Sequence, residues 1–347
     1  CDLGRKTIYN NITSAEKLKL VNPDNLELEK DFLDYLVSVD RSKGTIVNYK
    51  SDLEIFWCWN LENNRNKFFV DLSKRDVAKF QNYAMTEWKW SPKRIRRVKA
   101  TLSSLSNYIE NVLDDEYEGY RPIIRKIENP ADATVRDKTI FTQEELEYLL
   151  HTLVNAGRLD QACMLSLAMN NGRRKSELPR MKVTYFDKES LCFGGSLYKI
   201  PEEVTTKGRG SRGKPLTIYT LARPFQPYLD AWMDYRKHMG IESEWLIPKC
   251  LYGVYVDQQV PISVMNDWAD EFSNILGKPF YWHSLRHYFT TFLAASNIPD
   301  SVIQTIIGWD SADMCKIYND ASADQQLSKF FGEEGIKSVA PGSFSSI

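Results

Sequence analysis

The apolar residues in the first third of the chain recur at the spacing of an amphipathic helix. One such run follows Asn25 and consists of Leu26, Leu28, Phe32, Leu33, Tyr35 and Leu36. Ser42 is a suitable N-cap for a second helix, and a third is predicted from about Ser73 to Trp88. Ser91-Pro92 opens a fourth helix that runs to about Val112, because proline is tolerated in a first helical turn. The pattern predicts a compact unit of four helices joined by short connections.

The helical periodicity lapses between Arg121 and Lys138. Residues 128–134 read Glu-Asn-Pro-Ala-Asp-Ala-Thr, a composition typical of a loop. A chain of 347 residues is also long for a single core, so we predict two domains separated by this loop. The predicted parts are an N-terminal extension (1–24), a helical domain (25–127), a linker (128–138), a second domain (139–322) and a C-terminal tail (323–347).

The second domain mixes helical and extended patterns. Thr142 and the acidic residues after it predict a helix start, and a further helix from about Leu159 ends at Asn170-Asn171-Gly172. From Thr184 to Thr220 the residues favour strands, with turns at 187–190 and 207–214. After Leu221 the pattern is helical again to about Phe331. These patterns predict a mainly α fold with a small antiparallel β-sheet.

Composition and charge narrow the class of protein. An apolar fraction of 43% with nine tryptophans indicates a packed interior. Neither a membrane-spanning stretch nor an apolar signal-peptide core is present, which favours a soluble, cytoplasmic protein. The six cysteines are widely spaced and never form Cys-x-x-Cys, so we expect reduced thiols and no metal site. A net charge of -1 counts mildly against a nucleic-acid partner, unless the positive charges are clustered.

Three segments combine residues suited to phosphate chemistry. They are Gly172 to Leu178, His283 to Thr291, and Ile307 to Ser311, with Tyr318 nine residues beyond Trp309. Arginine binds an anionic phosphate with a planar fork that never loses its charge, and tyrosine can act as a covalent nucleophile. Taken singly, each piece has an ordinary structural interpretation: a solvated charge run at 173–175, a structural His-x-x-Arg pair, and a core Trp or Tyr.

The order of these residues resembles that of the tyrosine recombinase (phage integrase) family, whose signature is Arg, Lys, His-x-x-Arg, His or Trp, then Tyr. His283-Ser284-Leu285-Arg286-His287 is similar to the His-x-Leu-Arg-His box of that family, and Gly308-Trp309 to its Gly-His or Gly-Trp pair. Arg174 is favoured over Arg173 by its spacing to Ser176-Glu177-Leu178. The resemblance covers about Thr139 to Tyr318 and implies a two-domain, C-shaped DNA clamp, with a helical core-binding domain and a catalytic domain.

The resemblance assigns a role to each residue. Tyr318 would be the nucleophile, and Arg174 and Arg286 would hold the scissile phosphate. His283 would hydrogen-bond the phosphate or help to deprotonate Tyr318. Trp309 can only donate a hydrogen bond, so it would bind a phosphate oxygen and not act as a base. Lys207 would be the general acid, with Arg212 and Lys214 as nearby alternatives. Glu177 would orient an arginine; the alternative is a surface glutamate.

Basic residues elsewhere are candidates for binding the DNA backbone. Ile95 and Val98 should turn one face of the fourth helix inward and leave its basic residues outside, although solvated surface is the alternative. The start of the second helix and the loop at 207–214 add further cations. The candidate DNA-binding residues are Lys43, Lys93, Arg94, Arg96, Arg97, Lys99, Arg209 and Arg212.

As the resemblance implies, the chain would cut and rejoin double-stranded DNA at specific core sites, through a 3′-phosphotyrosyl intermediate and a Holliday junction. It would serve a phage, transposon or other mobile element, as a homo-tetramer on two DNA sites, with accessory DNA-bending proteins as further partners. No metal, ATP or other cofactor is expected, because the covalent intermediate conserves the bond energy. The alternatives are a type IB topoisomerase and a non-catalytic DNA-binding regulator of the same fold.

Overall fold

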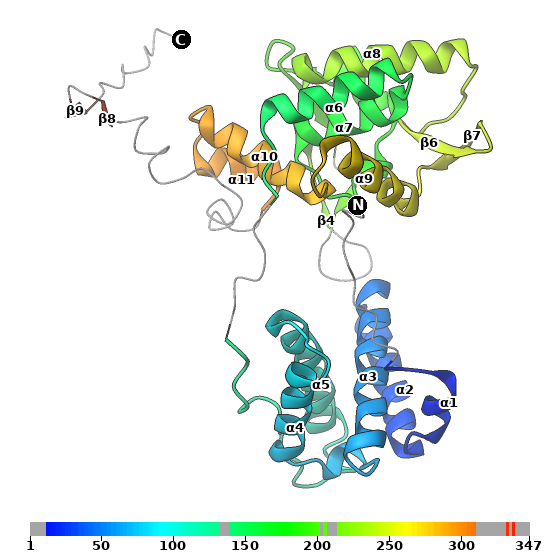
Figure 1. Ribbon diagram of the computed structural model, residues 1–347, viewed down its shortest axis with the longest axis vertical. Coiled ribbons are helices and arrows are strands. Elements are labelled where there is room, and N and C mark those ends of the chain that lie inside the picture. Colours follow the sequence, from blue (N-terminus) through cyan, green and yellow to red (C-terminus); the bar gives the residue numbers. More distant parts are fainter. Residues whose placement is uncertain are drawn as a thin grey trace. The chain divides into compact units, whose positions relative to one another are not determined.

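The computed structural model describes residues 12–131, 139–201, 204–206, 214–309, 331–332 and 335–336. The chain divides into two compact units that meet in sequence at residues 137 and 138, within the predicted linker. We call the part within 12–131 the helical unit and the part from 139 onward the mixed unit (Figure 1). Among the described residues, no helix combines the length and the apolarity that crossing a membrane requires.

The helical unit follows the predicted pattern, with one helix added at its start. Its elements are α1 (Ala15–Leu20), α2 (Pro23–Ser38), α3 (Lys43–Asn63), the 3₁₀ turn η1 (Phe69–Asp71), α4 (Lys74–Thr86) and α5 (Pro92–Val112). Ser42, Ser73 and Ser91 each accept a hydrogen bond from a backbone N–H in the first turn of α3, α4 and α5. These caps satisfy donors that a helix start otherwise leaves unpaired.

Aromatic side chains fill the core of the helical unit. Phe56, Trp57, Phe69 and Phe80 are fully buried and pack edge to face in several pairs. Ile12 and Val21 belong to the same core, although they lie in the segment 1–24 that we predict as an extension. The helical unit therefore uses part of that segment to close its core.

The mixed unit contains helices and short antiparallel strands. Its helices are α6 (Gln143–Asn155), α7 (Leu159–Asn171), α8 (Ala222–His238), α9 (Ile262–Leu276), α10 (Trp282–Ala295) and α11 (Asp300–Ile307), with 3₁₀ turns η2 (Leu178–Arg180), η3 (Val183–Phe186) and η4 (Lys188–Ser190). Its strands are β1 (Leu191–Cys192), β2 (Leu197–Ile200), β3 (Thr205–Thr206), β4 (Lys214–Pro215), β5 (Ile218–Leu221), β6 (Pro248–Leu251), β7 (Val254–Gln259), β8 (Phe331–Gly332) and β9 (Gly335–Ile336). Strands β1, β2 and β5 form an antiparallel sheet, and β3–β4, β6–β7 and β8–β9 pair in twos.

Helix α7 lies at the centre of the mixed unit. Every residue from Gln161 to Asn171 is buried, and the helix packs against α6, α8, α10 and β5. From Gln161 onward the helix has no solvent-exposed face, and its few polar residues, Gln161, Ser166, Asn170 and Asn171, are buried with the apolar ones. Because α7 is held from several directions, the turn that follows it has a fixed position, and this turn carries Arg173 and Arg174.

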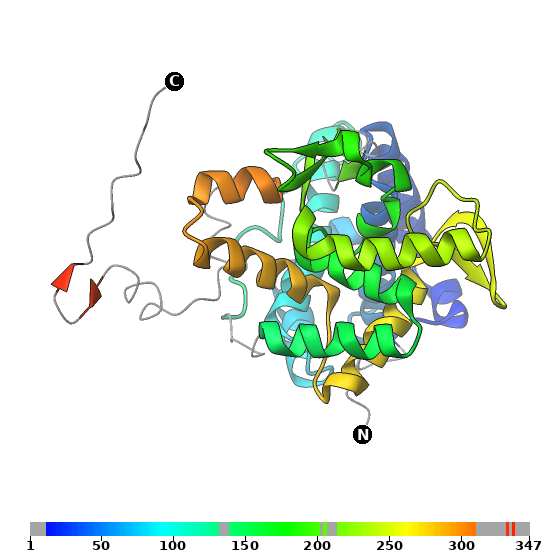
Figure 2. The same ribbon diagram turned by 90° about the horizontal axis from the view of Figure 1, so that it is seen from above.

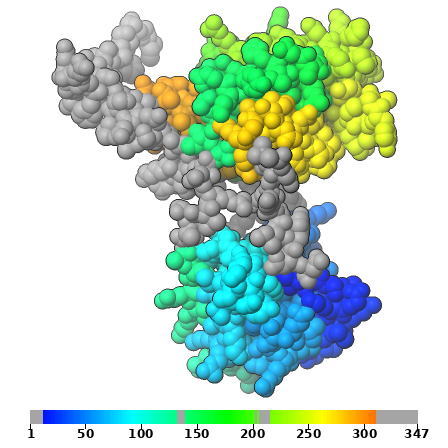
Figure 3. Space-filling model, in the orientation of Figure 1, coloured from blue at the N-terminus to red at the C-terminus, as the bar shows by residue number. Residues whose placement is uncertain are grey.

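The prediction of continuous helix after Leu221 is wrong in one place. Strands β6 and β7 form a hairpin in which Leu251 pairs with Val254, and the fully exposed Tyr252 lies at its tip. In two views the hairpin lies at the opposite side of the mixed unit from α11, and the space-filling view shows it at the edge of the surface (Figures 1, 2 and 3). The turn residues Tyr252 and Gly253 have positive φ, which ends one strand and starts the next.

Candidate active site and DNA-binding residues

A glycine turn brings the three chemical segments together. Gly172 ends α7 in the left-handed conformation, with φ of 59°. A Cβ atom at this position would lie 2.7 Å from Phe289 Cδ1 in α10 and 2.9 Å from Ile307 Cδ1 at the end of α11. A larger residue would clash there, so the turn after α7 packs directly against both helices.

Arg174 is held by Glu177. The backbone N–H of Arg174 donates to Glu177 Oε2 at 3.1 Å, and its Nη1 donates to Oε1 at 2.9 Å. The Arg174 side chain is 32% exposed, whereas that of Glu177 is 1% exposed. Burial by itself would raise the pKa of Glu177, but the charge of Arg173 and the hydrogen bonds from Arg174 outweigh burial and lower this pKa below its usual value. Glu177 is therefore ionised, and it orients Arg174.

Arg286 is completely buried where α7, α10 and α11 meet. Its Nη1 donates to the carbonyl of Gly172 at 2.9 Å, and its Nη2 donates to the carbonyl of Ile307 at 3.4 Å. The guanidinium carbon lies 5.3 Å from the centre of the Trp309 ring, which favours the cation electrostatically. Arg286 thus joins the turn before Arg174 to the turn before Trp309.

His283 lies one helical turn before Arg286 on α10. His283 is exposed at the surface, but partial desolvation, together with the positive charges of His287, Arg286 and Arg174, lowers its pKa below the usual value. The His283 and His287 rings meet edge to face, with centroids 5.6 Å apart. The imidazole of His283 is therefore mainly neutral at neutral pH, and a neutral imidazole can accept a proton.

Arg173 points into the protein, unlike Arg174. It is 1% exposed, and its Nη2 donates to the carbonyls of Ile306 at 2.9 Å and Ile307 at 2.6 Å. These carbonyls end α11, where the helix dipole favours a positive charge. Of the two adjacent arginines, only Arg174 has an appreciable part of its side chain at the surface.

A second glycine turn carries Trp309. Gly308 ends α11 with φ of 72°, and a Cβ atom there would clash with Leu216 Cδ2. The segment between β4 and β5 therefore rests against this turn. Two of the predicted catalytic residues, Lys207 and Tyr318, lie outside the described residues, so the geometry covers Arg174, Glu177, His283, Arg286 and Trp309.

Comparison with known proteins gives the family. Residues 139–325 match the phage integrase family. The chain belongs to this family. It is therefore a tyrosine recombinase, an enzyme of site-specific DNA recombination. A recombinase-like protein YomM, derived from the SPbeta prophage of Bacillus subtilis, is 28% identical over 83% of this chain and 87% of its own length.

Solved structures share the fold of this recombinase. XerH recombinase bound to its difH substrate matches with a TM-score of 0.64 and 16% identity, over 90% of this chain and 96% of that one. A lambda integrase tetramer bound to a Holliday junction matches with a TM-score of 0.61 and 13% identity, over 85% and 77% of the chains. The predicted mainly α fold with a small antiparallel β-sheet is confirmed, and two-stranded sheets accompany the three-stranded one.

The basic residues of α5 in the recombinase differ in what they contact. Lys93 is exposed, and Lys43 is exposed at the start of α3. Arg97 is 55% exposed on its side chain and forms an ion pair with the buried Asp52 at 2.5 Å. Arg94 stacks on the Trp90 ring at 4.0 Å, and Arg96 donates to the carbonyl of Pro130 at 2.6 Å. Arg209 and Arg212 lie outside the described residues.

The prediction that Lys99 lies on the outward face of α5, available to DNA, is wrong. Lys99 is 3% exposed, and its Nζ donates to Gln81 Oε1 at 2.7 Å and to the carbonyls of Ile127 and Glu128 at 3.0 and 3.1 Å. Ile95 and Val98 do face inward as predicted. Lys99 follows Ile95 by four residues and so lies on the same helix face, a spacing that the sequence already contained.

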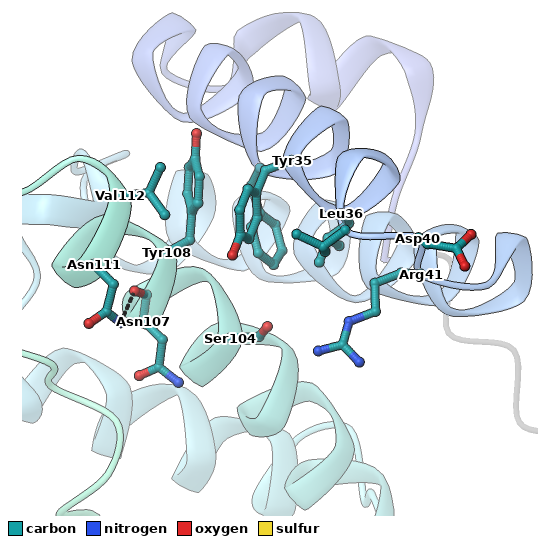
Figure 4. A pocket seen from close by; sticks show the side chains of 11 residues that line it. Tyr35, Leu36, Asp40, Arg41, Ser104, Asn107, Tyr108, Asn111 and Val112 are labelled. Atoms are coloured by element: carbon teal, nitrogen blue, oxygen red, sulfur yellow. Dashed lines mark hydrogen bonds between the residues drawn. The ribbon is translucent and has the colours of Figure 1, made fainter. Parts of the chain in front are cut away.

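A pocket in the helical unit lies apart from these residues. It measures about 580 Å³ and is lined by α2, the turn after it and α5. The Tyr35 and Tyr108 rings stand close together in it, with centroids 4.9 Å apart, and Arg41 reaches in at another side (Figure 4). None of the predicted catalytic or DNA-binding residues lines this pocket.

Proposed function

We propose that this recombinase cuts one DNA strand by attack of the Tyr318 hydroxyl on the scissile phosphate and rejoins it to a partner strand. The observation that supports this most is the convergence of Arg174, His283, Arg286 and Trp309 where α7, α10 and α11 meet. Such a cluster of fixed donors is suited to a phosphodiester, whose non-bridging oxygens gain negative charge in the transition state.

The two arginines stabilise that charge in different ways. Glu177 holds Arg174 through its backbone and one side-chain nitrogen, and the partly exposed side chain of Arg174 can meet DNA. Arg286 is anchored on two carbonyls and adds fixed positive charge behind the site. Because both are held before DNA binds, little reorganisation is needed during the reaction.

Proton transfer falls to the remaining residues. His283, kept mainly neutral by its surroundings, accepts the Tyr318 proton or a hydrogen bond from the reacting group. The Tyr318 oxygen forms a bond to phosphorus, the bond to the 5′ oxygen breaks, and Lys207 protonates that oxygen. The Trp309 indole N–H donates to a phosphate oxygen. The freed 5′ hydroxyl then attacks the phosphotyrosine of a partner strand, so no metal, ATP or other cofactor is consumed.

The assembly and the setting are part of the proposal. The helical domain (25–127) and the catalytic domain (139–322), joined by the linker (128–138), would close as a clamp on duplex DNA. Four protomers would exchange strands between two core sites through a Holliday junction, which is what the lambda integrase tetramer binds. The prophage origin of the YomM relative supports a mobile element as the setting. DNA-bending accessory proteins and a cytoplasmic location complete the proposal.

The test measures formation of a covalent protein–DNA adduct on a nicked suicide substrate. The substrate is built from the DNA on either side of the gene for this chain. The protein is incubated with it in the presence of a chelator, and the products are separated on a denaturing gel. A covalent protein–DNA band is expected with the unmodified chain and should be abolished in Tyr318→Phe, because that variant lacks the nucleophilic oxygen. Tyr252→Phe, which alters a fully exposed tyrosine of the hairpin tip, is the matched control and should retain the band.

Two other outcomes would contradict the proposal. Specific binding of the substrate with no adduct, even on preformed junctions, would favour a non-catalytic regulator. An adduct accompanied by relaxation of supercoiled DNA, but never by strand exchange between two sites, would favour a type IB topoisomerase.

A further inference from the structure

The strongest feature outside the proposed catalytic set is the buried Arg173. Its guanidinium lies between the ends of two helices, α7 and α11. Nη2 donates to the carbonyls of Ile306 and Ile307, and Nε donates to the carbonyl of Asn171 at 3.3 Å. The backbone N–H of Arg173 is itself bound by Asn171 Oδ1 at 3.0 Å. One side chain therefore ties the start of the Arg174 turn to the end of α11.

The end of α11 determines where Trp309 lies. The backbone N–H groups of Gly308 and Trp309 donate to the carbonyl of Gln304 at 2.8 and 3.0 Å. The Gln304 side chain donates back to the carbonyl of Trp309 at 3.1 Å. The carbonyl of Ile307 accepts from both Arg173 and Arg286. A change at Arg173 is thus transmitted to Trp309 through a single turn.

Burying the Arg173 guanidinium costs free energy, because a charged group must be removed from water. Burial lowers the pKa of Arg173 to about 10, a net shift that the charge of Glu177 opposes and the charge of Arg174 increases. Arg173 is still charged at neutral pH, so the desolvation cost remains. A complete set of buried charges can often be replaced by apolar side chains without loss of stability, although removal of one member alone is destabilising. Packing at this position therefore does not by itself require an arginine.

We propose that Arg173 is a positioning residue for strand cleavage, which fixes the α11 terminus so that Trp309 stays against Arg286 beside the phosphate held by Arg174. Arg173 does not touch the DNA; it acts through the Ile306 and Ile307 carbonyls. This inference rests on the proposed function for its catalytic consequence.

The first test compares two buried arginines of the mixed unit. Arg236 is 4% exposed and, like Arg173, donates to backbone carbonyls, those of Ser243, Trp245 and Leu246, far from the cluster in sequence. Arg173→Met and Arg236→Met are compared in single-turnover adduct formation on saturating suicide substrate, at a temperature where both variants are folded. Arg173→Met should lower the rate by about 10- to 100-fold, the range typical of residues that orient a functional group, with DNA affinity little changed. Arg236→Met should stay close to the unmodified rate.

A double-mutant cycle tests whether Arg173 acts through Trp309. Trp309→Phe keeps a ring over Arg286 but removes the indole donor. If the two residues act together, Arg173→Met should lower the rate much less in the Trp309→Phe background than in the unmodified chain. Equal losses in both backgrounds would show that Arg173 affects cleavage by another route, and the inference would fail.

Hydrogen exchange gives a readout that needs no cleavage. Arg173→Met should speed exchange of the Gly308 and Trp309 amides, while Arg236→Met should leave them unchanged. If the unmodified chain forms no adduct, the proposed function fails, and this exchange result still decides whether Arg173 fixes the turn. Unmodified exchange at Gly308 and Trp309, or an unmodified cleavage rate in Arg173→Met, would overturn the inference.

Discussion

Each unit of the recombinase buries a glutamate, and the two carboxyls behave in opposite ways. Glu29, in α2 of the helical unit, is 6% exposed and accepts a hydrogen bond from Trp57 Nε1 at 2.7 Å. Burial raises the pKa of Glu29 to about 7, since the Trp57 bond and the Lys50 charge only partly offset burial and the repulsion from Glu54. Glu177 is 1% exposed in the mixed unit, yet its pKa is lowered.

The difference lies in the partners. Desolvation disfavours the ionised form of both carboxyls, and a neutral indole donor compensates for less of it than two guanidinium groups do. Glu29 is a polar link between α2 and α3 whose charge depends on pH. Glu177, between Arg173 and Arg174, stays ionised and is part of a permanently charged cluster. The second arrangement is the one that the proposed phosphate site needs, because its positive charge must be in place before the reaction begins.

The largest expected effect comes from removing the charge of Glu177. In Glu177→Gln, Arg174 loses its charged anchor, and Arg173 is left as a buried cation without its compensating anion. We expect adduct formation to fall by about 10- to 100-fold and the free energy of unfolding to drop by about 3 kcal/mol or more. Single-turnover gels and urea unfolding measure the two quantities.

Glu29→Gln is the matched control for that variant. It alters an equally buried carboxyl in the other unit, so adduct formation should be unchanged. A similar loss of cleavage in both variants would mean that burial of a glutamate, and not its arginine partners, is what the reaction depends on.

Much of the fold was predictable because its signals are local. Ser42, Ser73, Ser91-Pro92 and Thr142 mark helix starts within a few residues of the helices they cap, and the structure confirms all four. The β6–β7 hairpin was missed because it is a surface element. Val254 to Gln259 has no regularly alternating buried face, so the two-residue periodicity that identifies a strand is absent.

The residues of the candidate site could be predicted from the sequence, but the hydrogen bonds that connect them could not. Spacing alone separates Arg174 from Arg173, because Ser176, Glu177 and Leu178 follow at fixed distances. The contacts of Arg173 could not be predicted, since its partners Ile306 and Ile307 lie 133 and 134 positions away. Whether a neighbouring arginine points inward depends on such long-range packing, which one sequence does not specify.

The pH dependence of the helical unit is the next prediction. The folded unit keeps the Glu29 proton up to a pKa of about 7, whereas an unfolded glutamate releases it near its ordinary pKa of 4.5. The stability that Glu29 contributes is therefore fully present below about pH 4.5 and is lost as the pH rises through about 7. Glu29→Gln should remove this loss, so its urea midpoint should fall less than that of the unmodified chain between about pH 5 and 8. Parallel pH curves for the two proteins would show that Glu29 titrates normally.

The smallest expected effect separates two lysines six residues apart on α5. Lys93 is exposed, whereas Lys99 is buried on acceptors of its own unit, so only Lys93 can release a counterion from DNA. Lys93→Met should weaken binding to a random-sequence duplex by about fivefold to tenfold near 0.1 M salt and reduce the salt slope by about 1. Lys99→Met should leave the slope unchanged and act on stability alone. Fluorescence anisotropy titrations at a series of salt concentrations measure both slopes. A reduced slope for Lys99→Met would mean that its ammonium leaves the core when DNA binds. The helical unit would then contribute a buried cation to DNA binding, as we propose for the mixed unit.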